Sequence, residues 1–501
     1  MIKFDTDIYA ASKEDVAEKI AACRAVQSAW ASRPWNDRAK YIKAVQKYLG
    51  DHGDEIAEVI HQDNGKLKLD ALVTEVLPAA MAAGYYCKRG KSVLRKKRVT
   101  GGNLLMFNKK SRIVYEPYGV VGIISPWNYP FAIPFSEIVM ALLAGNGVIL
   151  KVARDTLQVG RLLAHIFKEV NLPEHLFSYV ELAGKDAGPA FIEGGVDKLF
   201  FTGSTAVGKE LMERAAPRLL PLVLELGGAD AAVVRSGADL DRAARGILWA
   251  GFSNAGQSCG GVQRVLVHRD VYQPFLDKLT GMVKSLRYGA GPNDDMGPMI
   301  SENQKKTVQK QIDECISRGA VVAAENTPPG DDPRYAPAMV LTNLTMDMPI
   351  MRDEIFGPVV GVHPVKDDDE AVAIANASCY GLTGSVWSKN KREAMAVAQR
   401  LQAGAIMIND HLMSHGLAET PWGGFGDSGF GRTHGEMGLL EMVRSKVIVD
   451  DTLPGAKRNL WWHPYSEDVY RGMQAILSMV ASFRFSAVPK VLKIFFTYWK
   501  K

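Results

Sequence analysis

The 501-residue sequence has few cysteines, no low-complexity tract and no internal repeat. Its five cysteines are widely separated and never form a Cys-x-x-Cys pair, which excludes a disulfide framework and a zinc ribbon and favours a reducing compartment. The N-terminus has neither the basic nor the apolar segment of a signal peptide, so we expect a cytoplasmic protein. With 47% hydrophobic and 23% charged residues, the chain has the composition of a folded soluble protein.

The net charge of +5 is unevenly distributed along the chain. Residues 456–501 contain eight Lys or Arg and two acidic residues, whereas the rest of the chain is close to neutral. A near-neutral body argues against nucleic acid as a partner. The basic run from Lys88 to Arg98 has no stacking aromatics nearby, and we interpret it as a solvated face.

The pattern of apolar residues changes along the chain. Residues 13–90 show the three-to-four spacing of amphipathic helices, and from residue 118 short β-branched runs alternate with helical stretches. A second alternating series follows the LELGG segment, with expected strands at 262–268 and 359–365. Strands that alternate with helices predict an α/β fold, here with two doubly wound parallel-sheet domains.

Cys259, in the segment GQSCGG, is a candidate nucleophile. Gly256, Gly260 and Gly261 would let a substrate and a cofactor approach closely, and a thiolate so placed can attack a carbonyl carbon. The alternative for a single cysteine is a buried, inert side chain. Glu225 follows the apolar run LVL at the end of an expected strand, where sheets of this type open onto the ligand cleft. It is therefore a candidate general base, and the alternative is a structural acid.

Two further segments fit the same chemistry. In SPWNYP, two prolines rigidify a turn that displays Asn128, whose amide can donate a hydrogen bond to a developing oxyanion; the alternative is a helix cap packed with aromatics. In FFTGSTAVGKE, Gly203, Ser204 and Gly208 lie in a glycine turn and helix start that can hold a pyrophosphate. This second segment lacks the G-x-G-x-x-G fingerprint, so it is a weak nucleotide signal by itself.

Six motifs in series resemble the aldehyde dehydrogenase superfamily: PWNYP, FTGS, LELGG, GQSC, EIFGP and PWGGFGDSGFGR, between about residues 15 and 450. The resemblance implies that Cys259 is the nucleophile, that Glu225 activates the deacylating water, and that Asn128 stabilises the oxyanion together with the Cys259 backbone N–H. These are the roles that the residues themselves suggest. The implied reaction is addition of the thiolate to an aldehyde, hydride transfer that leaves a thioester, and hydrolysis to the acid.

The resemblance also implies NAD or NADP as the cofactor. His411 and His415 have the i, i+4 spacing of a metal-binding pair, but their segment lacks the carboxylate–histidine pattern of a zinc hydrolase, so we expect no metal site. Lys151 would reach the adenosine ribose, Ser204 the pyrophosphate, and Glu354 with Phe356 the nicotinamide ribose and ring. The full set of cofactor-binding residues that we expect is Trp127, Lys151, Arg154, Gly203, Ser204, Gly208, Leu226, Gly227, Glu354 and Phe356.

The expected organisation is a Rossmann-like cofactor domain over 1–95 and 118–226 and a catalytic domain over 227–430. Residues 96–117 and 431–455 would form a small β oligomerisation arm, because the first of these segments has the alternating pattern of two strands. The expected assembly is a homodimer or a homotetramer.

The sequence departs from the family at positions that affect specificity. Three residues after Lys151, where relatives commonly have an acidic residue, it has Arg154, which pairs well with a phosphate and makes NADP a candidate beside NAD; the neighbouring Asp155 could compensate. Glu137 occupies a position where many relatives have a lysine, and LELGGK is replaced by LELGGA. These changes leave the three catalytic positions intact.

Tyr129, Ser258 and Trp422 suggest an apolar tunnel for an aliphatic or aromatic aldehyde. The alternatives to a hydrolytic enzyme are a dehydrogenase that acylates coenzyme A, which Glu225 argues against, and a silent binding relative, which the intact catalytic set argues against.

The tail 456–501 combines ten aromatic with eight basic residues. Its longest uncharged stretch, 472–483, is too short to span a bilayer. Aromatic anchors and Lys/Arg side chains favour a peripheral contact with an anionic membrane, and the alternative is packing over a partner subunit.

Overall fold

The computed structural model describes residues 9, 11–99, 106, 108–453, 459, 462–482 and 488–489. Contacts divide the chain into two units. The first comprises residues 1–94 and 116–444, and the second comprises residues 95–115 and 445–501. Both parallel sheets and the candidate active site belong to the first unit.

The first sheet of this unit has six strands in the order β17-β7-β6-β3-β4-β5. All pairs are parallel except β17 with β7. The central strands are buried on both faces and consist mainly of β-branched and aromatic residues, as helices covering both faces require. The strands are β3 (Val120–Ile124), β4 (Gly147–Lys151), β5 (Phe177–Tyr179), β6 (Lys198–Thr202), β7 (Leu222–Glu225) and β17 (Gly429–Phe430).

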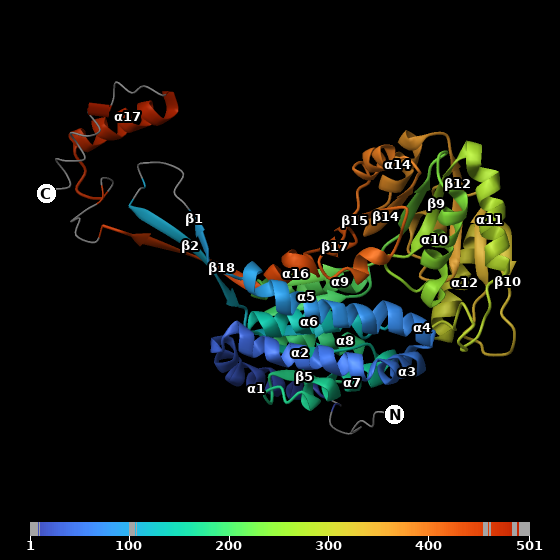
Figure 1. Cartoon of the computed structure of the whole chain (residues 1–501), viewed down its shortest axis with the longest axis horizontal. Helices are drawn as coiled ribbons and strands as arrows, with labels where there is room; N and C mark the ends of the chain where they lie inside the picture. The colour runs from blue at the N-terminus through green and yellow to red at the C-terminus, as the bar shows by residue number, and fades with distance from the viewer. Residues whose placement is uncertain are drawn as a thin grey trace. The chain divides into compact units, whose positions relative to one another are not determined.

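Helices flank this sheet, and α6 is buried along its whole length because it lies against β3 and β4 and is covered by α2 and α5 (Figure 1). Before α5 the chain forms a π-helix, η1, which continues directly from α4. The helices are α1 (Lys13–Ser32), α2 (Trp35–Asp51), α3 (Gly53–Asn64), α4 (Lys68–Ala71), η1 (Leu72–Val76), α5 (Leu77–Val93), α6 (Ala132–Ala144), η3 (Arg154–Thr156), α7 (Leu157–Glu169), α8 (Gly184–Gly194), α9 (Thr205–Ala215) and η4 (Ala216–Arg218).

The second sheet has seven strands in the order β10-β11-β12-β9-β8-β14-β15, parallel except for the edge strand β10. Helices α10 and α11 pack against β9, and α10 also packs against β12 (Figure 1). The strands are β8 (Asp230–Val234), β9 (Val262–His268), β10 (Val321–Asn326), β11 (Ala338–Thr342), β12 (Val359–Val365), β14 (Thr383–Trp387) and β15 (Ala405–Ile408); β13 (Tyr380–Gly381) and β16 (Phe425–Gly426) pair separately.

The helices around the second sheet follow the alternation expected from the sequence. They are α10 (Leu240–Phe252), η5 (Ser253–Gly256), η6 (Arg269–Val271), α11 (Tyr272–Lys284), α12 (Glu302–Ser317), α13 (Pro349–Arg352), α14 (Asp368–Asn376), α15 (Lys391–Ala398), η7 (Met413–Gly416) and α16 (Gly435–Glu441). The predicted α/β class with two parallel sheets is confirmed, and β9 and β12 coincide with the predicted strands.

The contacts divide the chain differently from the expected domains. They join the expected cofactor and catalytic domains in one unit, and they group residues 431–444 with that unit rather than with the arm. The physical reason is that α16 packs on α5 and α6, while β17 adds a strand to the first sheet.

The second unit contains a three-stranded sheet in the order β1-β2-β18 and one helix, α17 (Glu467–Ser482). Its strands β1 (Lys97–Val99) and β18 (Val443–Asp451) are largely exposed, and β2 (Lys109–Pro117) is mostly half-buried. Within the unit, Asp451 forms an ion pair with Lys109 and accepts a hydrogen bond from Asn108. Among the described residues, no helix combines the length and the apolar character needed to cross a membrane.

Candidate active site

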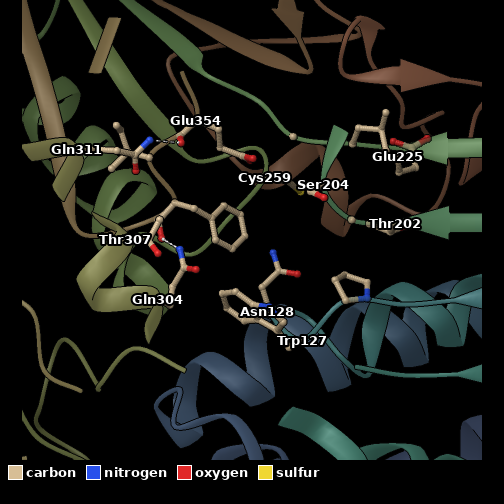
Figure 2. Close-up of a pocket in the computed structure, with 16 residues that line it drawn as sticks. Trp127, Asn128, Thr202, Ser204, Glu225, Cys259, Gln304, Thr307, Gln311 and Glu354 are labelled. Carbon is tan, nitrogen blue, oxygen red and sulfur yellow. Dashed lines mark hydrogen bonds between the residues drawn. The ribbon is translucent and has the colours of Figure 1, made fainter. Parts of the chain in front are cut away.

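A cavity of about 310 Å³ lies where the carboxyl ends of β3, β6 and β7 meet segments that precede β8, β9 and β12 (Figure 2). Strand order reverses between β3 and β6, and such a switch point is where open α/β sheets bind ligands. The lining residues are Pro126, Trp127, Asn128, Thr202, Gly203, Ser204, Glu225, Leu226, Gly227, Cys259, Gln304, Thr307, Gln311, Glu354, Ile355 and Phe356. All three predicted catalytic residues are among them.

A strained turn places Cys259 at this cavity. Asn254, Ala255 and Gly256 all have left-handed backbone angles, with φ of 51°, 53° and 71°. A Cβ on Gly256 would lie 2.1 Å from the carbonyl oxygen of Gly357, so only glycine fits there. Non-glycine residues adopt this conformation at an energetic cost, and such strain is common at functional sites.

The surroundings of the half-buried Cys259 disfavour a thiolate at rest. Burial, followed by the carboxylates of Glu354, Asp230 and Glu225, raises the pKa of the thiol well above its usual range. The resting side chain is therefore a neutral thiol, and attack on an aldehyde requires removal of its proton.

Glu225 is the last residue of β7, opposite Thr202 of β6, and its side chain is almost fully buried. Neither of its carboxyl oxygens has a hydrogen-bond partner among the described residues. Burial and then Glu137 raise its pKa well above the usual value, and Arg432 opposes this shift. A carboxylate that is not committed to another group can accept a proton from a water molecule.

A second, small cavity of about 10 Å³, room for roughly one water molecule, borders the first. Glu137 of α6 lines it together with Glu225, His415, Trp422 and His434. Burial raises the pKa of Glu137 to about 8 and lowers the pKa of His415 to about 4, so the imidazole is neutral near pH 7. Two carboxyl groups thus line one small cavity.

Asn128 lies in the turn between β3 and α6, and its side-chain Nδ2 donates to the main-chain oxygen of Gln257, 3.2 Å away. Asn254 joins the two loops, because its Nδ2 donates to the main-chain oxygens of both Asn128 and Gln257. Asn128 and Cys259 face the same cavity (Figure 2), so the amide can serve as an oxyanion donor at the reacting carbon.

Seven of the ten predicted cofactor residues line the cavity, and several features fit a dinucleotide. Ser204 precedes α9 and makes no capping hydrogen bond, so its hydroxyl and the helix N-terminus can receive a phosphate. The rings of Trp127 and Phe356 lie 5.3 Å apart, edge to face. A Cβ on Gly227 would lie 2.3 Å from Oε2 of Glu354, whose carboxylate can accept ribose hydroxyls.

The other three predicted cofactor residues do not line this cavity. Lys151 ends β4 and is 5% exposed, whereas Arg154 is exposed in η3. Gly208 is a packing residue of α9, since a Cβ there would lie 2.7 Å from Leu226.

Three polar residues of α12 were not predicted. Gln304, Thr307 and Gln311 line the cavity, and the two glutamine side chains donate to the main-chain oxygens of Phe356 and Glu354. Their three-and-four spacing places them on one helix face. This spacing of polar residues is the feature of the sequence from which they could have been predicted.

Of the predicted substrate residues, Tyr129 and Trp422 are buried and Ser258 is half-buried. His415 lies between the two aromatic rings, at centroid distances of 6.2 Å from Tyr129 and 4.9 Å from Trp422. His415 was not predicted to belong to this wall.

The family model of the "Aldehyde dehydrogenase family" matches residues 5–448. The Mycolicibacterium smegmatis protein "Putative succinate-semialdehyde dehydrogenase [NADP(+)]" is 39% identical, with 88% of this chain and 86% of that protein covered. The "4,4'-diapolycopene aldehyde oxidase" of a Methylomonas species is 35% identical, with 93% and 87% covered. The crystal structure of a point mutant of betaine aldehyde dehydrogenase from Staphylococcus aureus with NAD+ has a TM-score of 0.85 at 29% identity, covering 91% of this chain and 93% of that one. The chain belongs to the aldehyde dehydrogenase family and is an NAD(P)-dependent oxidoreductase of aldehydes.

Proposed function

We propose that this enzyme oxidises an apolar aldehyde to its free carboxylic acid through a thioester on Cys259. The observation that carries this proposal is the buried carboxyl group of Glu225, which lines the same cavity as the cysteine and has no hydrogen-bond partner in the described part of the chain. A thiol and an uncommitted base at one site are the two groups that acylation and hydrolysis require.

In the first half-reaction, Cys259 gives its proton to solvent and its sulfur bonds to the aldehyde carbon. The oxygen of the resulting thiohemiacetal carries the negative charge, which the Asn128 amide and the Cys259 backbone N–H stabilise. When bound, NAD(P) accepts the hydride that leaves this carbon. The product on the enzyme is a thioester.

In the second half-reaction, Glu225 takes a proton from water, whose oxygen attacks the thioester carbon and expels the cysteine sulfur. The buried position of Glu225 supports this role, because its raised pKa makes it a better base than an exposed glutamate. The presence of this base favours hydrolysis over transfer to coenzyme A.

The side chains around the small cavity next to Cys259 favour an apolar substrate. Tyr129, the neutral His415 and Trp422 provide aromatic surface, while the buried carboxyl groups of Glu137 and Glu225 offer a substrate carboxylate no positive partner. A succinate-semialdehyde substrate, which the name of one relative indicates for that protein, carries such a carboxylate. The Methylomonas relative is named for an apolar polyene aldehyde, and we propose a substrate of that character here.

The second unit supports the predicted oligomerisation arm and the predicted membrane contact. Val447, Ile448 and Val449 are exposed on β18, an edge strand that could pair with a second copy. On α17, Tyr470 and Leu477 are exposed at helical spacing, together with Met473 and Val480. We propose that this apolar face and the basic tail bind an anionic membrane. Much of the basic part of the tail lies outside the described residues.

The substrate proposal is tested with matched aldehydes of the same chain length, one uncharged and one with a terminal carboxylate. Formation of reduced cofactor is followed with NAD and NADP, with and without coenzyme A. We expect a higher kcat/KM for the uncharged aldehyde and no dependence on coenzyme A. A preference for the carboxylate-bearing aldehyde would overturn the apolar substrate, and acyl-coenzyme A as product would overturn hydrolysis.

The membrane proposal is tested by co-sedimentation of the full chain with anionic vesicles at low and high salt. We expect binding that weakens with salt, because attraction of basic residues to anionic lipid is screened. A chain lacking residues 456–501 should bind less. A change of oligomeric mass on truncation, without loss of vesicle binding, would assign the tail to a subunit contact instead.

A further inference from the structure

A fully buried ion pair, Lys66 with Glu75, lies behind the turn that holds Asn128. Lys66 Nζ is 2.6 Å from Oε1 of Glu75, and both side chains have no exposed surface. Lys66 follows α3 and Glu75 belongs to η1, so two separate elements contribute to the pair.

The π-helical turn η1 brings Glu75 to the start of α6. Such a turn inserts an extra residue into a helix and changes the direction of the side chains around it, and it is common at functional sites. Oε2 of Glu75 accepts hydrogen bonds from the backbone N–H groups of Phe131, at 2.7 Å, and Ala132, at 3.2 Å. A carboxylate at a helix N-terminus is stabilising, so Glu75 fixes the end of the turn that joins α6.

Lys66 fixes the other end of the same turn. Its Nζ donates to the main-chain oxygen of Asn128, 2.8 Å away, and lies 4.0 Å from the centre of the Tyr129 ring. The amino group therefore contacts two consecutive residues of the turn, in addition to the carboxylate of Glu75.

A purely structural explanation accounts poorly for this pair. Taking two charges out of water costs several kcal/mol per ion, and well-packed apolar residues of similar size are often as stable or more stable. What apolar residues could not provide is a donor for the Asn128 oxygen and an acceptor for two N–H groups. All of these hydrogen bonds converge on residues 128–132.

We propose that Lys66 and Glu75 are positioning residues that hold the Asn128 turn so that its amide meets the developing oxyanion. This inference rests on the oxyanion role of Asn128 in the proposed function. The pair does not touch the reacting atoms, and its effect on the reaction passes through Asn128.

The test is a double-mutant cycle between Lys66→Met and Asn128→Ala, read as the single-turnover rate of reduced-cofactor formation at saturating aldehyde and cofactor. We expect Asn128→Ala to slow this step by about 100-fold, as loss of an oxyanion donor does. Lys66→Met should slow it by roughly tenfold in the otherwise unchanged enzyme, and by less than about twofold when Asn128 is already alanine, because coupled residues are not additive. The Kd for NAD(P) should stay within about twofold.

Lys198→Met is the matched control. Lys198 is also a buried lysine paired with a carboxylate, Glu441, and it lies 4.9 Å from the centre of the Tyr118 ring, but it does not contact the Asn128 turn. We expect it to lower the melting temperature while the single-turnover rate is maintained. If Lys66→Met does not fold, Glu75→Gln replaces it in the same cycle, because the amide oxygen still accepts from Phe131 while the charge is lost.

The outcomes separate this inference from the proposed function. If Asn128→Ala leaves the single-turnover rate unchanged, the oxyanion role is wrong and the inference fails with it. If Asn128→Ala slows the step, but Lys66→Met slows it equally with asparagine and with alanine at position 128, the inference alone is wrong. An equal slowing by Lys198→Met would also overturn it, since the effect would then be general loss of stability.

Discussion

The reacting end of the site and the expected ribose-binding end differ in the solvent exposure of their ionisable groups. At the reacting end, Glu225 is buried and has no hydrogen-bond partner among the described residues, and three carboxyl groups act on the Cys259 thiol. At the other end, Arg154 is exposed in a short 3₁₀-helix after β4. Burial shifts the pKa values of Glu225 and Cys259, on which the reaction depends. The exposed Arg154 can act on a bound cofactor only through an electrostatic field that solvent and salt screen. Substitutions at the reacting end should therefore stop the reaction, and substitutions at the other end should only redirect it.

The largest expected effect is that of Cys259→Ala. Without the sulfur no thioester forms, so aldehyde oxidation should fall by at least about 1,000-fold, as loss of a nucleophile typically causes. Cofactor binding should be nearly unchanged, because the thiol is not needed to hold the dinucleotide. Steady-state rates and a fluorescence titration with NAD(P)H measure the two properties. Substantial residual oxidation by the alanine variant would refute the assignment of the nucleophile.

The second effect, that of Glu225→Gln, separates the two half-reactions. Loss of a general base costs about 100-fold or more, and here the loss should fall on hydrolysis of the thioester. A burst of reduced cofactor should therefore survive while steady turnover falls. Stopped-flow measurements show both phases. Disappearance of the burst itself would assign Glu225 to activation of the thiol.

The third effect concerns pH and is smaller. Glu225 acts as a base only when ionised, so turnover should fall as the pH drops through its raised pKa. Glu137, which lines the same small cavity, is the second cause of that rise after burial. The other titratable groups around the pair are Cys259, His415, His434 and Arg432.

Glu137→Gln removes one of two coupled carboxyl groups, so the acid side of the turnover profile should move to lower pH. The profile of steady turnover between about pH 5 and 9 measures this shift, with the burst phase as an internal control for acylation. An unchanged acid limb would show that the two carboxyl groups titrate independently.

Much of this site could be predicted from the sequence because its residues belong to short, local motifs. Asn128 follows β3, Glu225 ends β7 and Cys259 precedes β9. The apolar runs of these strands are visible in the sequence, and the strand ends converge by topology. The same local patterns predicted β9 and β12 at their observed bounds.

The residues that were missed act through contacts between distant segments. The Lys66–Glu75 pair depends on a π-helical turn, for which no periodicity in the sequence is diagnostic, and on its approach to residues 128–132. His415 was not predicted to line the site, because its packing between Tyr129 and Trp422 arises from tertiary structure. The grouping of 431–444 with the first unit likewise depends on how α16 packs.

The smallest expected effect is that of Arg154→Glu, at the expected ribose-binding end of the site. A carboxylate after β4 would accept the ribose hydroxyls and repel a 2′-phosphate, so the preference should move toward NAD. Because the side chain is exposed and its field is screened, we expect a change of roughly tenfold in the ratio of kcat/KM for NADP to that for NAD, larger at low salt. Lys168→Glu is the matched control: it makes the same change of net charge at the far end of α7, about 20 Å along the helix, and should leave the ratio unaltered. An equal change in both variants would show a general charge effect, and no change in either would show that Arg154 points away from the ribose.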